Sequence, residues 1–325
     1  MSHLISIIVP VYNSATILPD LLTAIDEERE REHWNLELLL IDDGSRDESY
    51  AVIERLSMQH DYIRGFQLSR NFGHQPAVRF GLRASRGEYV AIIDDDMQDP
   101  PNLLPRFFKY LDEGRDVAYG VRKKRKEWPH KILSYVLFYR LLTMLSEHPI
   151  PLDAGDFCVM KRRVVDAMLL LSERNPFLRG IRAWVGFKQV GVEYERQDRY
   201  QGESGYTFKK LLRIASDGIF SFSNIPLQIA TYIGAFSLIV ALAFGAYTLF
   251  LYFTQQVQIQ GFTALMMFVL FFGSINMICI GIIGTYIARI YAEGKFRPDV
   301  IVAEQTHQKE PIQDRDERKR MLVNH

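Results

Sequence analysis

The sequence predicts an α/β domain with a mostly parallel sheet, followed by two long apolar helices. The first observation is a series of strand-like apolar runs that alternate with helix-like segments. The strands are expected at 5–11, 36–41, 63–68 and 89–93, and the helices at 17–30, 47–59 and 75–84. Near-continuous apolar strands that alternate with helices are typical of βαβ units. The second observation is a pair of uncharged apolar stretches after residue 225.

The bulk composition limits the function classes. The 39 lysines and arginines balance the 39 aspartates and glutamates, so no global basic field points to nucleic acid. The two cysteines, Cys158 and Cys279, do not make a disulfide framework, which agrees with a reducing compartment. The apolar run Leu4–Val11 lacks a basic leader and contains Pro10, so we interpret it as a strand and not as a signal peptide.

The two apolar stretches are predicted to span a membrane. They run from about Ile229 to Phe253 and from about Phe262 to Ala288, and both exceed the roughly 20 residues that cross a bilayer core. Cations flank the pair on both outer sides: Lys209, Lys210, Arg213, Arg289, Lys295 and Arg297. The positive-inside rule then places both flanks and both termini in the cytoplasm. The alternative is a buried helical hairpin in a soluble protein.

Four regions follow from these observations. We expect a cytoplasmic domain over 1–206 and a basic amphipathic helix at the membrane surface over 207–224. A two-helix hairpin over 225–290 comes next, and a polar tail over 291–325 that is disordered towards its end.

Acidic residues follow two of the predicted strands. Asp42 and Asp43 lead into a Gly-Ser turn, where they either cap a helix or accept hydrogen bonds from a base or a ribose. The triplet from Asp94 to Asp96 follows the strand at 89–93, and Gln98 comes two residues later. Adjacent carboxylates repel each other, and Mg²⁺ or Mn²⁺ bound together with a diphosphate would remove that penalty. The alternative is a solvated acidic turn.

A further acidic pair and several cations complete the candidate set. Asp153 and Asp156 surround a glycine, and either forms a simple loop or provides a general base. Arginine suits phosphate recognition through its planar fork. The candidates are Arg122, Arg125, Arg179 and Arg199, although a run such as 122–126 is also typical of a solvated face or of a site for anionic lipid headgroups.

Taken in order, these motifs resemble the inverting family 2 glycosyltransferases. The likeness is to polyprenyl-phosphate sugar synthases related to dolichol-phosphate mannose synthase, including bacterial members with two transmembrane helices. The motifs that carry it extend over nearly the whole chain: Ile8–Asn13, 42–45, Ser69–Gly73, 94–96, 155–157, Arg179–Trp184 and the segment that begins at Arg199.

The resemblance implies a glycosyltransferase A fold, a nucleotide-sugar donor with UDP-glucose favoured, and a polyprenyl phosphate such as undecaprenyl phosphate as acceptor at the inner membrane. It implies that Asp94, Asp96 and Gln98 hold a divalent cation, with Asp96 and Asp156 acting in catalysis. Residues implied around the donor are Pro10, Tyr12, Asp42, Asp43, Asn71, Asp94 and Asp95. Residues implied near donor or acceptor phosphates are Arg122, Arg125, Arg179, Arg199 and Ser204.

Three positions depart from the pattern of that family. Ser14 stands where Glu is usual, Cys158 where Arg is usual, and Gly205 where Lys is usual. Two phosphate-binding cations are therefore missing, and Lys209, Lys210 or Arg162 are candidates to replace them.

The expected mechanism needs little proton removal. A phosphate monoester has its second pKa near 6, so the acceptor is mostly dianionic at neutral pH. We therefore expect Asp156 to orient the acceptor more than to deprotonate it. The alternatives are a processive polysaccharide synthase and a non-catalytic membrane scaffold. Two-helix hairpins often associate, so a homo-oligomer is a further expectation.

Overall fold

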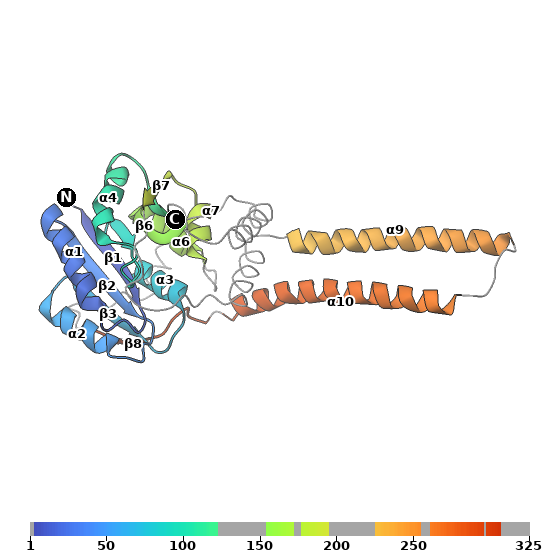
Figure 1. Cartoon of the computed structure of the whole chain (residues 1–325), viewed down its shortest axis with the longest axis horizontal. Helices are drawn as coiled ribbons and strands as arrows, with labels where there is room; N and C mark the ends of the chain where they lie inside the picture. The colour runs from blue at the N-terminus through green and yellow to red at the C-terminus, as the bar shows by residue number, and fades with distance from the viewer. Residues whose placement is uncertain are drawn as a thin grey trace, which may run out of the picture. The chain divides into compact units, whose positions relative to one another are not determined.

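The computed structural model describes residues 3–122, 154–171, 177–194, 225–254, 261–295 and 297–306. These residues divide into two compact units (Figure 1). One unit contains the sheet and includes 297–306, and the other contains the two long apolar helices.

A mostly parallel sheet forms the first unit, as predicted. Its eight described strands are β1 (Leu4–Val11), β2 (Asn35–Asp42), β3 (Ile63–Leu68), β4 (Tyr89–Ile92), β5 (Val117–Arg122), β6 (Ala154–Lys161), β7 (Gln189–Tyr194) and β8 (Val302–Gln305). Their order across the sheet is β7-β5-β6-β4-β1-β2-β3-β8. β1 to β4 pair in parallel, whereas β6 is antiparallel to both β4 and β5, and β8 is antiparallel to β3.

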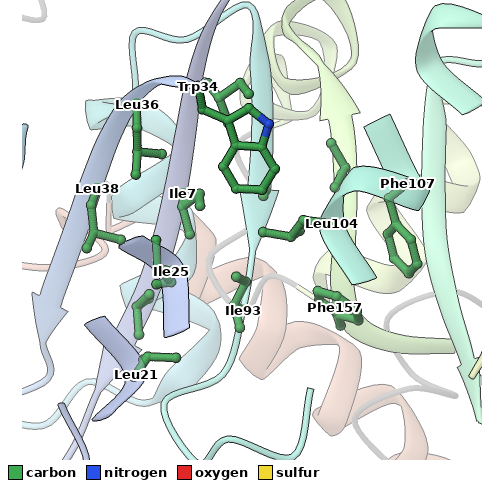
Figure 2. Packing of buried hydrophobic residues seen from close by; sticks show 14 of the residues in the cluster. Ile7, Leu21, Ile25, Trp34, Leu36, Leu38, Ile93, Leu104, Phe107 and Phe157 are labelled. Atoms are coloured by element: carbon green, nitrogen blue, oxygen red, sulfur yellow. The ribbon is translucent and has the colours of Figure 1, made fainter. Parts of the chain in front are cut away.

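Helices cover both faces of this sheet, which explains why its central strands carry apolar side chains on both faces (Figure 1). The helices α1 (Leu18–Glu32), α2 (Ser49–Gln59) and α4 (Leu104–Asp112), with the short 3₁₀ turn Pro101–Leu103, pack on one face. The helices α3 (His74–Ala84), α6 (Arg162–Leu170) and α7 (Leu178–Trp184) pack on the other. In the first core, the Trp34 ring meets the Phe108 ring edge-on at 5.3 Å, and Ile7, Leu38 and Phe107 belong to the same cluster (Figure 2).

Strand direction gathers several loops at one edge of the sheet. β1, β2, β3 and β4 run in parallel, so their carboxyl ends meet at this edge. β6 runs the opposite way beside β4, with Cys158 opposite Ile92, so the first residues of β6 lie at the same edge. Ligands of open α/β sheets bind at such an edge.

The last described segment returns to the sheet, which corrects our expectation that 291–325 is only a polar tail. β8 pairs with β3 along Phe66 and Gln67. The Gly65 N–H donates to Thr306 Oγ1 at 2.9 Å, and the Thr306 N–H donates to the Gly65 carbonyl at 3.0 Å. Asp299 accepts from Arg83 Nη2 of α3 at 3.1 Å, with Arg79 Nε at 3.6 Å. Residues 297–306 are therefore part of the sheet unit.

The second unit contains α9 (Ile225–Phe253) and α10 (Phe262–Glu293). The helices pack on each other, with the Phe244 and Phe268 rings 5.0 Å apart. The segments Leu227–Tyr247 and Phe268–Ala288 are each 21 residues long, with mean hydropathies of 2.0 and 2.1. Only 6% and 0% of their most apolar windows are buried, unlike the core helices of a soluble protein. The predicted interface helix at 207–224 lies outside the described residues.

The β3–β8 junction yields a test of the returning segment. A T306V substitution keeps the shape of the side chain but leaves the buried Gly65 N–H without its hydroxyl acceptor. We expect the free energy of unfolding of the sheet unit to fall by about 1–3 kcal/mol. T306S keeps the hydroxyl and should cost less, and denaturant titration followed by tryptophan fluorescence would compare the two. Equal stability of T306V and the wild type would contradict the role assigned to this hydroxyl.

Candidate active site

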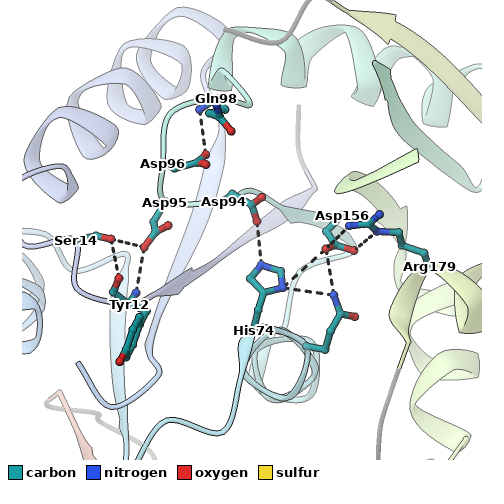
Figure 3. A network of polar contacts seen from close by, with 10 residues as sticks. Tyr12, Ser14, His74, Asp94, Asp95, Asp96, Gln98, Asp156 and Arg179 are labelled. Carbon is teal, nitrogen blue, oxygen red and sulfur yellow. Dashed lines mark hydrogen bonds and ion pairs between the residues drawn. The ribbon is translucent and has the colours of Figure 1, made fainter. Parts of the chain in front are cut away.

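His74 lies between two predicted carboxylates at the carboxyl edge of the sheet (Figure 3). Its Nε2 is 3.0 Å from Asp94 Oδ1, and its Nδ1 is 3.9 Å from Asp156 Oδ2. Burial alone would lower the pKa of His74, but the hydrogen bond to Asp94 and the charges of Asp94, Asp156 and Asp95 raise it to about 9. His74 is therefore a cation at neutral pH. Our sequence analysis missed it, because His74 and Asp94 are 20 positions apart in the sequence and no local pattern links them.

Asp156 is held by several donors at once. Arg179 of α7 binds it through two parallel bonds, Nε to Oδ1 at 2.8 Å and Nη2 to Oδ2 at 3.0 Å. Gln75 Nε2 donates to Oδ2 at 3.1 Å, and the Gln75 Oε1 accepts from the Leu178 N–H. Burial would raise the pKa of Asp156, but Arg179, His74 and Gln75 together hold it well below its usual range. A carboxylate in this state is a weak base.

Asp95 turns away from this cluster (Figure 3). Its Oδ2 accepts from Ser14 Oγ at 2.6 Å and from the Tyr12 N–H at 3.1 Å. Burial is the main reason that the pKa of Asp95 rises to about 6, and the charges of Asp94 and Asp96 add to the rise. Asp95 therefore ties the loop after β1 to the end of β4. Ser14, which departs from the expected pattern, supplies one of the two donors.

Asp94 and Asp96 are the pair that fits a divalent cation. They lie two residues apart after β4, and the Gln98 N–H donates to Asp96 Oδ1 at 3.2 Å in a turn where Met97 has a φ of 58°. Asp95 does not join them, and within the described ranges no group of three or more His, Cys, Asp or Glu side chains could hold a metal by itself. Two carboxylates are what Mg²⁺ commonly takes from a protein when substrate phosphates complete its coordination. The residues therefore fit a cation that is shared with a diphosphate.

The two aspartates after β2 have different partners. Both oxygens of Asp43 are engaged, because the Phe72 and Gly73 N–H groups donate to them at 2.7 and 2.9 Å. Asp42 is fully buried; its Oδ1 accepts from the Ser45 N–H, but its Oδ2 has no partner among the described residues. Asp43 therefore shapes the loop before α3, and Asp42 retains an acceptor for a hydroxyl or N–H donor.

Gly44 allows the loop after β2 to approach the loop between β3 and α3. It has a φ of +66°, and a Cβ at this position would lie 2.4 Å from the Arg70 carbonyl carbon. A side chain here would push away the loop that carries Asn71 and leads into α3.

Comparison with known proteins identifies the family. The model of glycosyl transferase family 2 matches residues 6–169. This chain belongs to glycosyl transferase family 2. It is 40% identical to the uncharacterized glycosyltransferase YkcC of Bacillus subtilis (strain 168) over 91% of this chain and 92% of that protein. It is 35% identical to the bactoprenol glucosyl transferase of Shigella phage SfV over 92% of this chain and 97% of that protein.

A prophage bactoprenol glucosyl transferase homolog of Escherichia coli (strain K12) is 36% identical over 92% of this chain and 98% of that protein. Among solved structures, a glucosyl-3-phosphoglycerate synthase from Mycobacterium tuberculosis, in complex with Mn²⁺, UDP and phosphoglyceric acid, has a TM-score of 0.44 and 16% identity. That likeness covers 67% of this chain and 77% of the other.

The other predicted site residues of this glycosyltransferase differ in their surroundings, and some of them lie outside the described residues. Pro10 is buried within β1 opposite Ile41, whereas Tyr12 is 42% exposed and Asn71 is exposed in the loop before α3. Arg122 ends β5, and only its backbone is described. The remaining predicted phosphate contacts, Arg125, Arg199 and Ser204, lie outside the described residues, as do Gly205 and Asp153.

Arg162 is engaged elsewhere in the glycosyltransferase domain. Its Nε and Nη2 donate to the Gly87 carbonyl at 2.8 and 2.6 Å, and its Nη2 also donates to Ser85 Oγ. Arg162 therefore holds the loop before β4 and does not replace the cation that is missing at Cys158, which is itself buried in β6.

The raised pKa of Asp95 predicts a stabilising substitution. Both hydrogen bonds to Asp95 use one oxygen, so D95N keeps them and removes a charge from the triplet. The folded-state pKa of about 6 lies above the unfolded value. Ionised Asp95 therefore lowers stability as pH rises from about 4 through 6, and this penalty is fully present at pH 7.5. We expect D95N to raise the free energy of unfolding by on the order of 1–2 kcal/mol at pH 7.5 without divalent cations.

Denaturant titrations with a chelator at pH 7.5 and near pH 4 would test this. The gain should be nearly lost near pH 4, where the folded-state carboxyl is protonated and the unfolded-state carboxyl is about half protonated. A loss of stability in D95N at pH 7.5 would refute the assignment.

Proposed function

We propose that the protein transfers a hexose from a nucleotide diphosphate sugar, with UDP-glucose favoured, to undecaprenyl phosphate, with inversion at the anomeric carbon. The observation that carries this proposal is the placement of Asp94 and Asp96 at the carboxyl edge of the sheet in a family 2 chain that also has two exposed apolar helices. The chain aligns over 92% of its length with proteins named bactoprenol glucosyl transferase, which supports a lipid phosphate acceptor.

The donor would occupy the side of the edge formed by β1, β2 and β4. Asp42 Oδ2 provides a buried acceptor for a base N–H or a ribose hydroxyl. Asp94 and Asp96, with Gln98 beside them, would hold Mg²⁺ or Mn²⁺ on the diphosphate. Such a cation stabilises the negative charge of the leaving diphosphate. The protein contributes a fixed orientation, because His74 and the Gln98 N–H hold the two carboxylates in place.

The acceptor side would be formed by Asp156 and Arg179. A phosphate oxygen of the acceptor attacks the anomeric carbon, the bond from that carbon to the diphosphate breaks, and the nucleoside diphosphate leaves. The attacking phosphate is mostly dianionic at neutral pH, so it has almost no proton to lose. The low pKa of Asp156 supports a role in orienting Arg179 and His74 rather than in general base catalysis.

The order of the segments along the chain supports a location of the whole sheet unit on one side of the membrane. The described residues before α9 (3–122, 154–171 and 177–194) and the described residues after α10 (297–306) all belong to this unit. If both helices cross a membrane, their outer ends must therefore emerge on the same side. The cations in both outer flanks favour the cytoplasmic side. We accordingly place the protein in the inner membrane with its catalytic domain in the cytoplasm, where soluble nucleotide sugars reach it.

A panel assay would test the reaction. Membranes that contain the full chain would receive undecaprenyl phosphate, Mg²⁺ or Mn²⁺, and a set of radiolabelled nucleotide sugars. We expect UDP-glucose to yield label that extracts into organic solvent, and D96N to lower kcat/KM by about 100-fold or more, because a cation ligand on the leaving group is lost. Label retained in a polymer would indicate a processive synthase instead. Absence of transfer from every donor would overturn the proposal.

The role of Asp156 gives a second test. D156N removes the counter-charge of Arg179 and His74, so we expect kcat to fall by about 10-fold or more at every pH between 6.5 and 9. The residual activity should not recover as the pH rises, because the acceptor phosphate has almost no proton to lose. Recovery of D156N activity at high pH would instead indicate that Asp156 is a general base. D112N, a change to an aspartate at the end of α4, serves as the control.

A further inference from the structure

A buried contact between Tyr194 and Asp99 lies beside the residues assigned to the cation. Asp99 directly follows Gln98 and is fully buried, whereas the five residues from Asp94 to Gln98 are half-buried. The Tyr194 hydroxyl donates to Asp99 Oδ1, although the two residues are 95 positions apart in the sequence. A buried carboxylate is costly unless donors or charges compensate it. The chain therefore keeps a carboxylate in its interior at the end of this turn and brings a donor to it from a distant strand.

The turn after β4 contains a strained residue that needs support on both sides. Met97, which lies between two residues assigned to the cation, has a φ of 58°, in the left-handed region that side chains other than glycine rarely adopt. Such a conformation persists only where the surrounding contacts hold it. Before Met97, the turn is held through Asp94 and Asp95, which contact α3 and the loop after β1 (Figure 3). After Met97, Asp99 holds it through the bond to Tyr194.

Packing fixes the ring of Tyr194 at the end of β7. The ring meets the Phe157 ring nearly edge-on, with 5.7 Å between the centroids and 69° between the planes. The Phe157 ring in turn lies 4.7 Å from the Phe107 ring of α4, and both are labelled in Figure 2. The Tyr194 ring also approaches the backbone of Gly120 in β5, where an added Cβ would lie 2.6 Å from Tyr194 Cε1. The hydroxyl of Tyr194 therefore has a fixed position, and Asp99 is held there.

The same packing connects the turn to the strand that carries Asp156. Phe157 directly follows Asp156 in β6, and its side chain is fully buried against Tyr194. We propose that Tyr194 and Asp99 are positioning residues that hold the turn after β4 in the conformation that binds the divalent cation. This inference rests on the proposed function, to which the cation belongs, and adds two residues that do not themselves touch the cation. Partners that orient metal ligands commonly change metal affinity by about 10-fold to 100-fold.

Binding of Mn²⁺ to the purified full chain would test this role. The electron paramagnetic resonance signal of free Mn²⁺, recorded in a titration with UDP present, gives the dissociation constant without any transfer of sugar. Y194F keeps the ring and its packing and removes only the hydroxyl that donates to Asp99. We expect Y194F to raise the dissociation constant for Mn²⁺ about tenfold, because the turn loses the contact that fixes its end.

Y89F is the matched control. Tyr89 begins β4, at the other end of the strand from the turn, and its hydroxyl donates to Asp112 Oδ1 of α4 at 2.8 Å. Both substitutions remove a hydrogen bond from a tyrosine to an aspartate, so both should lower the unfolding temperature. Only Y194F should weaken Mn²⁺ binding. Wild-type Mn²⁺ affinity in Y194F, or an equal loss of affinity in Y89F, would overturn the inference.

A double substitution shows whether the two residues act through one bond. D99A removes the acceptor of the Tyr194 hydroxyl, so Y194F should weaken Mn²⁺ binding less in the D99A background than in the wild type. Fully additive losses would mean that Tyr194 and Asp99 act separately and would contradict the proposal. If D99A does not fold, the comparison of Y194F with Y89F decides the question.

Transfer by the wild-type chain separates this inference from the proposed function. If the wild type transfers sugar to the lipid but Y194F keeps its Mn²⁺ affinity, the inference fails and the proposed function stands. If Y194F binds Mn²⁺ more weakly than the wild type, yet the wild type transfers sugar from no donor, the positioning role stands and the proposed reaction fails. A wild-type chain that binds no Mn²⁺ would overturn the inference.

Discussion

Negative charge crowded at one edge of the sheet is the constraint on which the rest of the site depends. Parallel pairing of β1, β2 and β4, with β6 antiparallel, brings these carboxylates to the same edge: Asp42, Asp43, Asp94, Asp95, Asp96 and Asp156. The chain stabilises them with different partners. Backbone N–H groups bind Asp43, a serine hydroxyl and a backbone N–H bind Asp95, and cationic side chains bind Asp94 and Asp156. Because these carboxylates have different partners, each is fixed in a different direction, which would keep the proposed donor side apart from the proposed acceptor side.

Helix α3 connects this site to the segment that follows the apolar helices. Its first residues, His74 and Gln75, contact Asp94 and Asp156. Further along the helix, Arg79 and Arg83 pair with Asp299, which follows α10 in the sequence. The same helix therefore carries His74 at the centre of the site and the arginines that pair with Asp299. A displacement of the segment that contains Asp299 would be transmitted through α3 to His74.

The sequence was sufficient for the parts of the fold that have strong local signals. The strands β1 to β4 are rich in large apolar residues and alternate with helices, so their positions and parallel pairing were predictable. The strand β8 was not predictable from the sequence, because Val302–Gln305 is short and partly polar, and only its pairing with β3 defines it. In the site, acidic motifs identified Asp94, Asp96 and Asp156, whereas His74 has no local pattern around it. Its contact with Asp94 joins residues that are 20 positions apart in the sequence, and Asp43 looked like a ligand residue although its oxygens are used by the backbone.

The order of synthesis gives the β3–β8 pairing another consequence. β8 emerges from the ribosome only after both apolar helices have been made. Until then the β3 edge presents unpaired N–H and C=O groups, which are a template for pairing with other chains. The sheet of the growing protein can therefore close at this edge only after both apolar helices have been made, and a chain that stopped before Val302 would leave the β3 edge without its partner strand.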